Sequence, residues 1–174
     1  MTAEITTGEA QLNIGIDVGS TTAKIVVVDN GKIVHERYER HFSQVREKLL
    51  ELFKNAYPFI RSRRFGCALS GSAGLGIAEA AKLPFVQEVF ATAETVKKYE
   101  PDTDVVIELG GEDAKIIFFK GGLDERMNGS CAGGTGAFID QMASLLDVTP
   151  DELDELSLKS TRIYPIASRC GGFA

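Results

Sequence analysis

The sequence predicts a mixed α/β fold in which two lobes begin with the same kind of β-hairpin. Residues 16–31, IDVGSTTAKIVVVDNG, align without a gap with residues 107–122, IELGGEDAKIIFFKGG. Matching positions hold an acid, a glycine, an alanine and a lysine in both copies. An internal repeat of this kind indicates duplicated structural units. Each copy is therefore expected to begin one lobe.

Each copy predicts two strands joined by a tight turn, because apolar and β-branched residues lie on both sides of a glycine-containing segment. After the first copy, the pattern predicts further strands and helices. These are a strand at 32–40, a helix at 45–53, a strand at 65–69, a glycine-rich turn leading into a short helix that reaches Lys82, and a helix at 88–99. Three antiparallel strands followed by alternating helices and strands define a mixed α/β lobe.

The second copy predicts a similar start with a different continuation. Strands are expected near 104–109, 114–119 and 123–127, and helices at 133–146 and 150–158. The predicted organisation is a polar tail at 1–11, a first lobe at 12–101 and the start of a second lobe at 102–174. Because fewer residues follow the second copy than the first, the second lobe is predicted to be truncated. We expect the natural polypeptide to continue beyond Ala174, or a partner chain to supply the rest.

Composition excludes several classes of function. Hydrophobic residues make up 44% of the chain and charged residues 25%, as in globular proteins. A net charge of -6, without a Lys/Arg face, argues against a nucleic-acid partner. No apolar stretch has the length of a membrane span, and the N-terminus lacks the pattern of a secretory signal. The chain is predicted to be cytoplasmic, with no membrane partner.

The cysteines and histidines have unlike surroundings. Three cysteines cannot all pair, which argues against a disulfide framework. Cys67 lies in an apolar run and is predicted to be a core residue. His35 and His41 lie in or beside a charged strand without neighbours at metal-ligand spacing, so both are predicted to be ordinary surface residues.

Two acid-and-glycine hairpins facing each other across a cleft would suit a nucleoside triphosphate. Glycines let backbone N–H groups approach phosphate oxygens, and hydroxyl groups can donate further hydrogen bonds. The candidate phosphate contacts are Gly19, Ser20, Thr21, Thr22, Gly110 and Gly111. Mg2+ prefers carboxylate and phosphate oxygens, so Asp17, which would hold the ion through water, and Glu108 or Asp113 are candidate catalytic acids. Lys24 and Lys115 are candidate phosphate ligands too, although a place within a strand favours a solvated or structural role.

The segment NGSCAGGTG, residues 128–136, places Cys131 in a glycine-rich loop before a predicted helix. Unpaired N–H groups and the positive end of the helix dipole would favour a thiolate there. The same geometry would stabilise an anionic iron–sulfur cluster, whose sulfurs accept backbone hydrogen bonds. Cys170 lies in a second such segment, beside Arg169. Two cysteines are too few for a four-iron cluster, but a homodimer would supply four.

Four motifs together resemble the ATP-dependent activators of 2-hydroxyacyl-CoA dehydratases and the related ATPase subunits of benzoyl-CoA reductases. They are IGIDVGSTTAK, IELGGEDAKI, NGSCAGGTGAFIDQMA and IASRCG, and the resemblance spans residues 14–174, with features of the long, multidomain activase subgroup. It implies an actin, Hsp70 and sugar-kinase type of fold, in which two ribonuclease-H-like lobes close on ATP or ADP with Mg2+. It also implies a 4Fe–4S cluster shared by two subunits and held by Cys131 and Cys170. Gly133, Gly134 and Thr135 of the cysteine loop join the candidate cofactor-binding residues.

The resemblance implies that ATP hydrolysis rearranges the lobes and that the reduced cluster passes an electron to a dehydratase or reductase component. Reduced ferredoxin or flavodoxin would be the donor. Two alternatives stay open. A small-molecule (sugar) kinase of the same fold would need a catalytic base and substrate loops, and it gives no reason for Cys131 and Cys170. A non-catalytic nucleotide-binding module is the other alternative.

Overall fold

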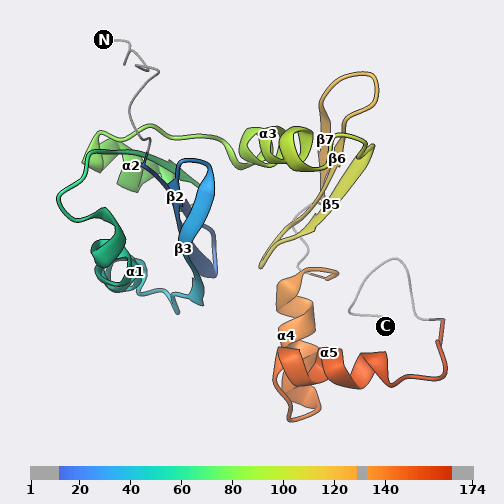
Figure 1. The fold of residues 1–174 in the computed structure, drawn as a ribbon. Coiled ribbons are helices and arrows are strands. Elements are labelled where there is room, and N and C mark those ends of the chain that lie inside the picture. Colours follow the sequence, from blue (N-terminus) through green and yellow to red (C-terminus); the bar gives the residue numbers. More distant parts are fainter. Residues whose placement is uncertain (1–11, 129–132, 166–174) are drawn as a thin grey trace. The chain divides into compact units, whose positions relative to one another are not determined.

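The computed structural model of the chain describes residues 12–128 and 133–165. The chain divides into two compact units, Met1–Thr92 and Ala93–Ala174, and each unit combines a β-sheet with helices (Figure 1). This confirms the predicted mixed α/β character. Within the described ranges, no helix combines the length and the apolar character that crossing a membrane requires.

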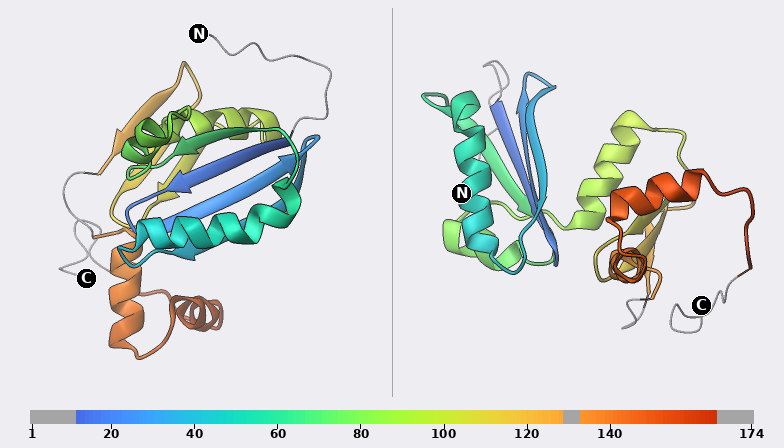
Figure 2. Two further views of the ribbon diagram at one scale, coloured as in Figure 1. Left: turned by 90° about the vertical axis from the view of Figure 1, so that its left-hand side faces the viewer. Right: turned by 90° about the horizontal axis from the view of Figure 1, so that it is seen from below.

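The first unit contains a four-stranded sheet with the strand order β3-β2-β1-β4. The strands are β1 (Leu12–Val18), β2 (Thr22–Asp29), β3 (Lys32–Arg40) and β4 (Phe65–Ser70). β1, β2 and β3 are consecutive antiparallel neighbours, whereas β4 pairs with β1 in parallel. Its helices are α1 (Val45–Ile60) and α2 (Leu75–Ala81), and α1 covers one face of this sheet (Figure 2). A further helix, α3 (Glu88–Tyr99), contains the boundary between the two units.

The core of the first unit lies between the sheet and its helices. In β1, every second side chain is buried, which is the period of a strand with one face on a core. The buried side chains are Leu12, Ile14, Ile16 and Val18 of β1, Ala23, Ile25 and Val27 of β2, and Leu52, Ala56 and Ile60 of α1. Cys67, which was predicted to be a buried core residue, is half-buried and packs against the edge of this cluster. Asp17 therefore lies on the opposite face of the sheet from the core.

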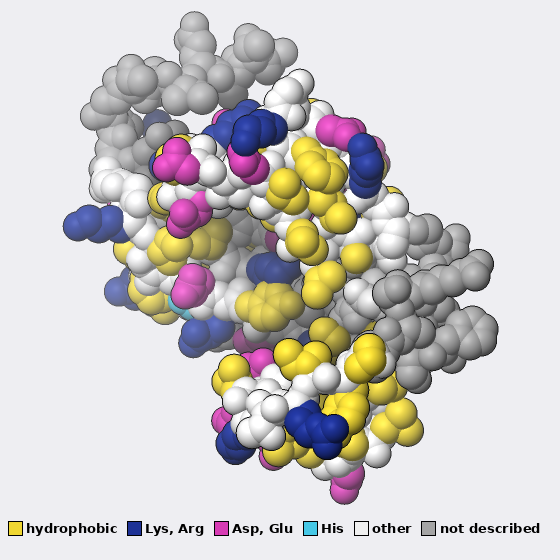
Figure 3. All heavy atoms as spheres, turned by 90° about the vertical axis from the view of Figure 1, so that its right-hand side faces the viewer, with side chains coloured by type: hydrophobic (Ala, Val, Ile, Leu, Met, Phe, Trp, Pro, Cys, Tyr) yellow, Lys and Arg dark blue, Asp and Glu magenta, His cyan; other side chains and the backbone are white. Residues whose placement is uncertain are grey.

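The second unit contains an antiparallel sheet with the order β5-β6-β7. Its elements are β5 (Val105–Leu109), β6 (Ala114–Phe118), β7 (Asp124–Met127), α4 (Gly136–Leu145) and α5 (Pro150–Leu158). Lys115 and Ile117 of β6 are buried, whereas Ile107 of β5 and Leu145 of α4 are exposed. Hydrophobic side chains are visible among charged ones on the surface in Figure 3.

Two helices differ from the predicted bounds by several residues, and α2 ends one residue before the predicted Lys82. α1 continues past Phe53 to Ile60 although it contains Pro58. The apolar spacing extends through Ala56 and Ile60, both buried, and Pro58 removes only the hydrogen bond that its own missing N–H would donate. α4 begins at Gly136 rather than at the predicted Gly133.

The prediction that both histidines are ordinary surface residues is wrong for His41, which is only 5% exposed. His35 is half-buried, and its ring stacks on Phe59 of α1 at a centroid distance of 4.9 Å. Among the described residues, no group hydrogen-bonds to the buried His35 Nε2. Burial, and secondarily the charge of Arg37, lowers the pKa of His35. The position between β3 and α1 thus favours the neutral form of the ring.

Acidification is expected to destabilise the packing of His35. Because the pKa of His35 is lower in the folded chain than the unfolded value of about 6.5, the unfolded state binds a proton more readily. The neutral ring's contribution to stability is therefore fully present above about pH 6.5 and is lost as the pH falls from that value through the lower pKa of the folded state. His35→Phe keeps the ring but cannot be protonated. The melting temperature should fall less between about pH 7.5 and 5.5 in this variant than in the wild type; equal falls would contradict the prediction.

Candidate functional site

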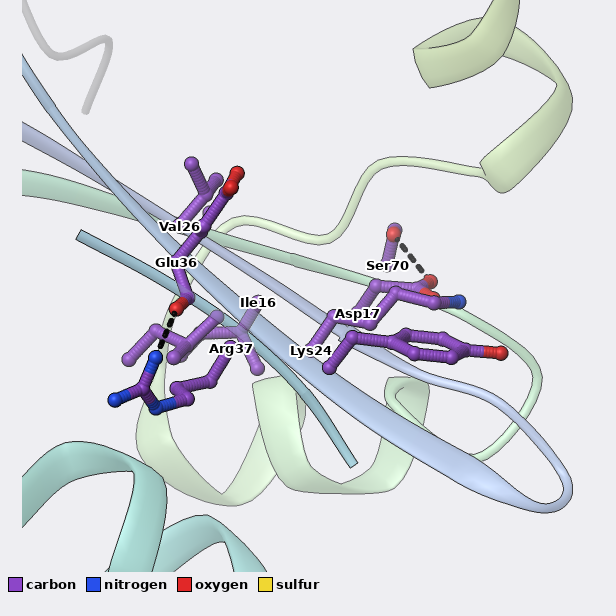
Figure 4. Close-up of a pocket in the computed structure, with 10 residues that line it drawn as sticks. Ile16, Asp17, Lys24, Val26, Glu36, Arg37 and Ser70 are labelled. Atoms are coloured by element: carbon purple, nitrogen blue, oxygen red, sulfur yellow. Dashed lines mark hydrogen bonds and ion pairs between the residues drawn. The ribbon is translucent and has the colours of Figure 1, made fainter. Parts of the chain in front are cut away.

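The candidate site of the first unit is a pocket of about 660 Å3 on the sheet face opposite the core. Residues of β1, β2 and β3 line the pocket together with Ser70 at the end of β4. Asp17 is placed there because its neighbours Ile16 and Val18 point into the core. Figure 4 shows Asp17, Lys24 and Ser70 grouped at one end of the pocket, with Glu36 and Arg37 at the other.

Two donors hold the Asp17 carboxylate. Lys24 Nζ donates to Oδ2 at 2.6 Å, and Ser70 Oγ donates to Oδ1 at 2.8 Å, the bond dashed in Figure 4. Lys24 also lies over the ring of Tyr38, with 5.1 Å between Nζ and the ring centroid. A carboxylate has about four lone-pair positions, so these two bonds leave room for a further donor or a metal-bound water. The Asp17 carboxylate is therefore held in place and can still accept a hydrogen bond from a further donor or a metal-bound water.

The turn after Asp17 is closed by a hydrogen bond from the Gly19 N–H to the Thr22 carbonyl at 2.9 Å. His41, the residue after β3, restrains this turn from outside it. The His41 N–H donates to the Thr21 carbonyl, and His41 Nε2 lies 3.1 Å from the Gly19 carbonyl oxygen. These contacts bring the predicted residues from Asp17 to Lys24 together at one end of the hairpin.

The glycine-containing loop after β4, residues 71–74, lies against the end of β1. The Ala73 N–H donates to the Val18 carbonyl at 2.9 Å. Gly71 has a φ of +90°, and a Cβ built there would lie 2.3 Å from the Val18 oxygen. Only glycine meets both demands. This loop therefore fixes the strand end that carries Asp17.

The second unit repeats the turn in the same register. The Gly110 N–H donates to the Asp113 carbonyl at 2.8 Å. Glu108 lies directly opposite Lys115, as Asp17 lies opposite Lys24. Lys115 Nζ is 3.9 Å from Glu108 Oε1 and 3.4 Å from Asp113 Oδ2. The predicted duplication is thus present in the backbone hydrogen bonds as well as in the sequence.

The start of α4 is bonded to this second turn. The N–H groups of Gly136 and Ala137 donate to the carbonyls of Gly110 and Gly111 at 2.8 and 2.9 Å. The prediction that this helix start presents unpaired N–H groups is therefore wrong for these two residues, because the turn takes them. Gly133, Gly134 and the buried Thr135 lead directly into the helix.

Cys131 and Cys170 lie outside the described residues. Within 12–128 and 133–165, no group of three or more His, Cys, Asp or Glu side chains is arranged to hold a metal ion. In the first unit, sequence reasoning missed Ser70 and His41. Ser70 could have been found from the sequence, because it directly follows the predicted strand at 65–69. In the structure it pairs in register with Asp17. His41 could not have been found in this way, since its role depends on where β3 ends.

One acid–glycine hairpin in each unit indicates the actin-like α/β fold, and a solved structure shares this fold. The activator of the 2-hydroxyisocaproyl-CoA dehydratase from Clostridium difficile, with bound ADPNP, superposes with a TM-score of 0.79 at 29% identity. The match covers 94% of this chain and 62% of that one.

Residues 14–174 match the model of the BadF/BadG/BcrA/BcrD ATPase family, and the chain belongs to this family. The chain is 31% identical over 167 residues to the (R)-2-hydroxyglutaryl-CoA dehydratase activating ATPase of Acidaminococcus fermentans. It is 30% identical to the activator of lactoyl-CoA dehydratase of Anaerotignum propionicum. Each match covers 92% of this chain and 64% of the relative, so the chain spans less than two thirds of these relatives.

Replacing Gly71 should damage the first unit, whereas replacing Gly76 should not. Gly71→Ala forces a side chain onto the Val18 carbonyl in a left-handed backbone conformation, so we expect a loss of about 1–3 kcal/mol in the free energy of unfolding. Gly76 lies in α2 with open space around its Cβ position, so Gly76→Ala should be neutral or stabilising by up to about 1 kcal/mol. Urea unfolding of both variants measures the difference, and equal effects would show that the loop is not seated as described.

Proposed function

We propose that the chain acts in an ATP-hydrolysing, iron–sulfur electron-transfer activator of a 2-hydroxyacyl-CoA dehydratase-like or benzoyl-CoA reductase-like enzyme. The observation that carries the proposal is the pair of acid–glycine turns built in one register, with Asp17 opposite Lys24 and Glu108 opposite Lys115. Membership of the BadF/BadG/BcrA/BcrD ATPase family and the names of the dehydratase-activating relatives support it. The activity is proposed for the whole protein, because the chain spans 64% of these relatives.

The first turn supplies the phosphate chemistry. Backbone N–H groups after Gly19 and the hydroxyls of Ser20, Thr21 and Thr22 donate hydrogen bonds to phosphate oxygens. Asp17 orients the water shell of Mg2+, which prefers to keep several waters. The hard oxygen donors of this pocket fit that ion. Phosphoryl transfer depends mainly on positioning and electrostatics, so an acid held by two donors suits this role.

The second turn supplies the link to the cysteine loop. Its acids are Glu108 and Asp113, both close to Lys115. The Gly110 and Gly111 carbonyls are bonded to the first amides of α4, and α4 follows the loop that contains Cys131. A nucleotide shifts a conformational equilibrium only through contacts that differ between the two states. These two hydrogen bonds are contacts through which a shift of the turn reaches α4.

Cys131 and Cys170 of two chains together supply the four thiolates of a 4Fe–4S cluster, with Gly133, Gly134 and Thr135 in the adjoining segment. Such a cluster, when bound, accepts and donates single low-potential electrons. We therefore propose a homodimer that takes its electron from reduced ferredoxin or flavodoxin in the cytoplasm and gives it to the dehydratase or reductase component.

Asp17→Asn tests the nucleotide site. The amide keeps the size of the side chain but removes the charge that Mg2+ and its waters require, so the Mg2+-dependent part of nucleotide affinity should fall at least about tenfold. A titration with a fluorescent ATP analogue, with Mg2+ and with EDTA, measures this part. The matched control is Asp29→Asn, which removes a carboxylate of the same sheet that pairs with Arg63. Equal affinity in Asp17→Asn and wild type would refute the site. Phosphate transfer to a sugar would identify a kinase instead.

Serine replacement of the cysteines tests the cluster. After anaerobic reconstitution with iron and sulfide, the broad visible absorption should be lost in Cys131→Ser and in Cys170→Ser. Cys67→Ser should keep it, because burial raises the pKa of the Cys67 thiol and so disfavours the thiolate that binds iron. Iron content and size-exclusion chromatography measure cluster and dimer together. A colourless wild-type protein, or loss of colour in Cys67→Ser alone, would contradict the proposal.

A further inference from the structure

His41 is bonded through its backbone and both ring nitrogens, although it follows β3 directly in a loop. Its N–H donates to the Thr21 carbonyl at 3.1 Å, and its carbonyl accepts from the Gln44 N–H at 2.7 Å. Nε2 lies 3.1 Å from the Gly19 carbonyl oxygen, and the Ser43 N–H donates to Nδ1 at 3.1 Å. A side chain that is 5% exposed and fully bonded has one orientation.

These contacts fix the tautomer of the ring. The Ser43 N–H can only donate, so Nδ1 carries a lone pair, and the Gly19 carbonyl can only accept, so Nε2 carries the hydrogen. Phe42 and Ser43 have φ values of +47° and +63°. They are the only two adjacent non-glycine residues in the left-handed region within 12–128 and 133–165. Such conformations persist when the surrounding contacts determine them.

The two turns of the repeat share this external restraint. Gly19 and Gly110 occupy the same place in the repeat, and the N–H of each closes its turn. The carbonyl of each also accepts a hydrogen bond from outside the turn, from His41 Nε2 in one unit and from the Gly136 N–H in the other. An imidazole in the first unit thus does what a helix amide does in the second.

A restraint on this carbonyl also orients a donor. The peptide bond is planar and trans, so the Gly19 carbonyl and the Ser20 N–H point in opposite directions. Holding the Gly19 oxygen against His41 therefore fixes the direction of the Ser20 N–H, one of the groups assigned to phosphate. The His41 N–H does the same for the peptide plane between Thr21 and Thr22.

We propose that His41 is the positioning residue of the first phosphate turn: its Nε2–H holds the Gly19 carbonyl and thereby sets the Ser20 N–H for phosphate. The inference rests on the proposed nucleotide site. It does not assign His41 any contact with the nucleotide.

Three variants separate hydrogen bonding from packing. His41→Phe keeps a ring of similar size without either nitrogen, His41→Gln restores an N–H donor at the ε position, and His35→Phe removes the other histidine as a matched control. In the wild type, long-range 1H–15N NMR should show the Nε2–H tautomer. In His41→Phe, the Gly19 amide should exchange faster and Mg2+-dependent affinity for a non-hydrolysable ATP analogue should fall about tenfold. His41→Gln should recover most of this loss, and His35→Phe should match the wild type.

The readouts distinguish the two proposals. Unchanged Gly19 exchange and affinity in His41→Phe, or an Nδ1–H tautomer in the wild type, would overturn the role of His41. An equal loss of affinity in His41→Gln and His41→Phe would also overturn it, by pointing to packing rather than to the donor. If the wild type binds no nucleotide while Gly19 exchange is faster in His41→Phe, the restraint on the turn stands and the nucleotide site falls.

Discussion

The register of the β1–β2 hairpin is the constraint on which the candidate site depends. Ile16 and Val18 are buried on one face, so Asp17 between them lies on the other, where Lys24 and Ser70 meet it. A shift of one residue would exchange the faces of the strand and carry the carboxylate into an apolar core. A charge buried there without a partner is strongly unfavourable. The same strand register therefore determines both the core packing and the position of the Asp17 carboxylate.

The same register places a lysine opposite the acid in both hairpins, but Lys24 and Lys115 differ in their burial. The Lys24 side chain is 43% exposed, so water can stabilise the ammonium if Asp17 takes another partner. The Lys115 side chain is 4% exposed and lies near both Glu108 and Asp113. Removing both acids would leave this buried ammonium without a counter-charge, whereas the Glu108 and Asp113 side chains themselves are 36% and 40% exposed. The duplication thus placed a partly exposed lysine beside the first acid and a buried lysine beside the second pair of acids.

Most of this architecture could be predicted because its causes are local. The repeat, the alternation of β1 and the glycines of both turns are visible in short windows of sequence, and β3, α3 and α5 have the predicted bounds. The missed features have causes that lie far away in the chain. His41 is buried because β3 ends beside the first turn, and the start of α4 is set by the Gly110 and Gly111 carbonyls. The residues that would test the cysteine prediction, Cys131 and Cys170, lie outside the described ranges.

The two turns are restrained by elements of different kinds, and this difference bears on the proposed electron-transfer function. The first turn is bonded to His41, which follows β3 of its own sheet, and the adjoining end of β1 is bonded to the loop after β4. The second turn is tied to α4, whose first amides are bonded to Gly110 and Gly111 and which follows the cysteine loop. Packed cores resist deformation, whereas a helix can shift as a rigid element. On the proposed function, the first turn fixes the phosphates, and the second turn communicates their presence to the cysteine loop.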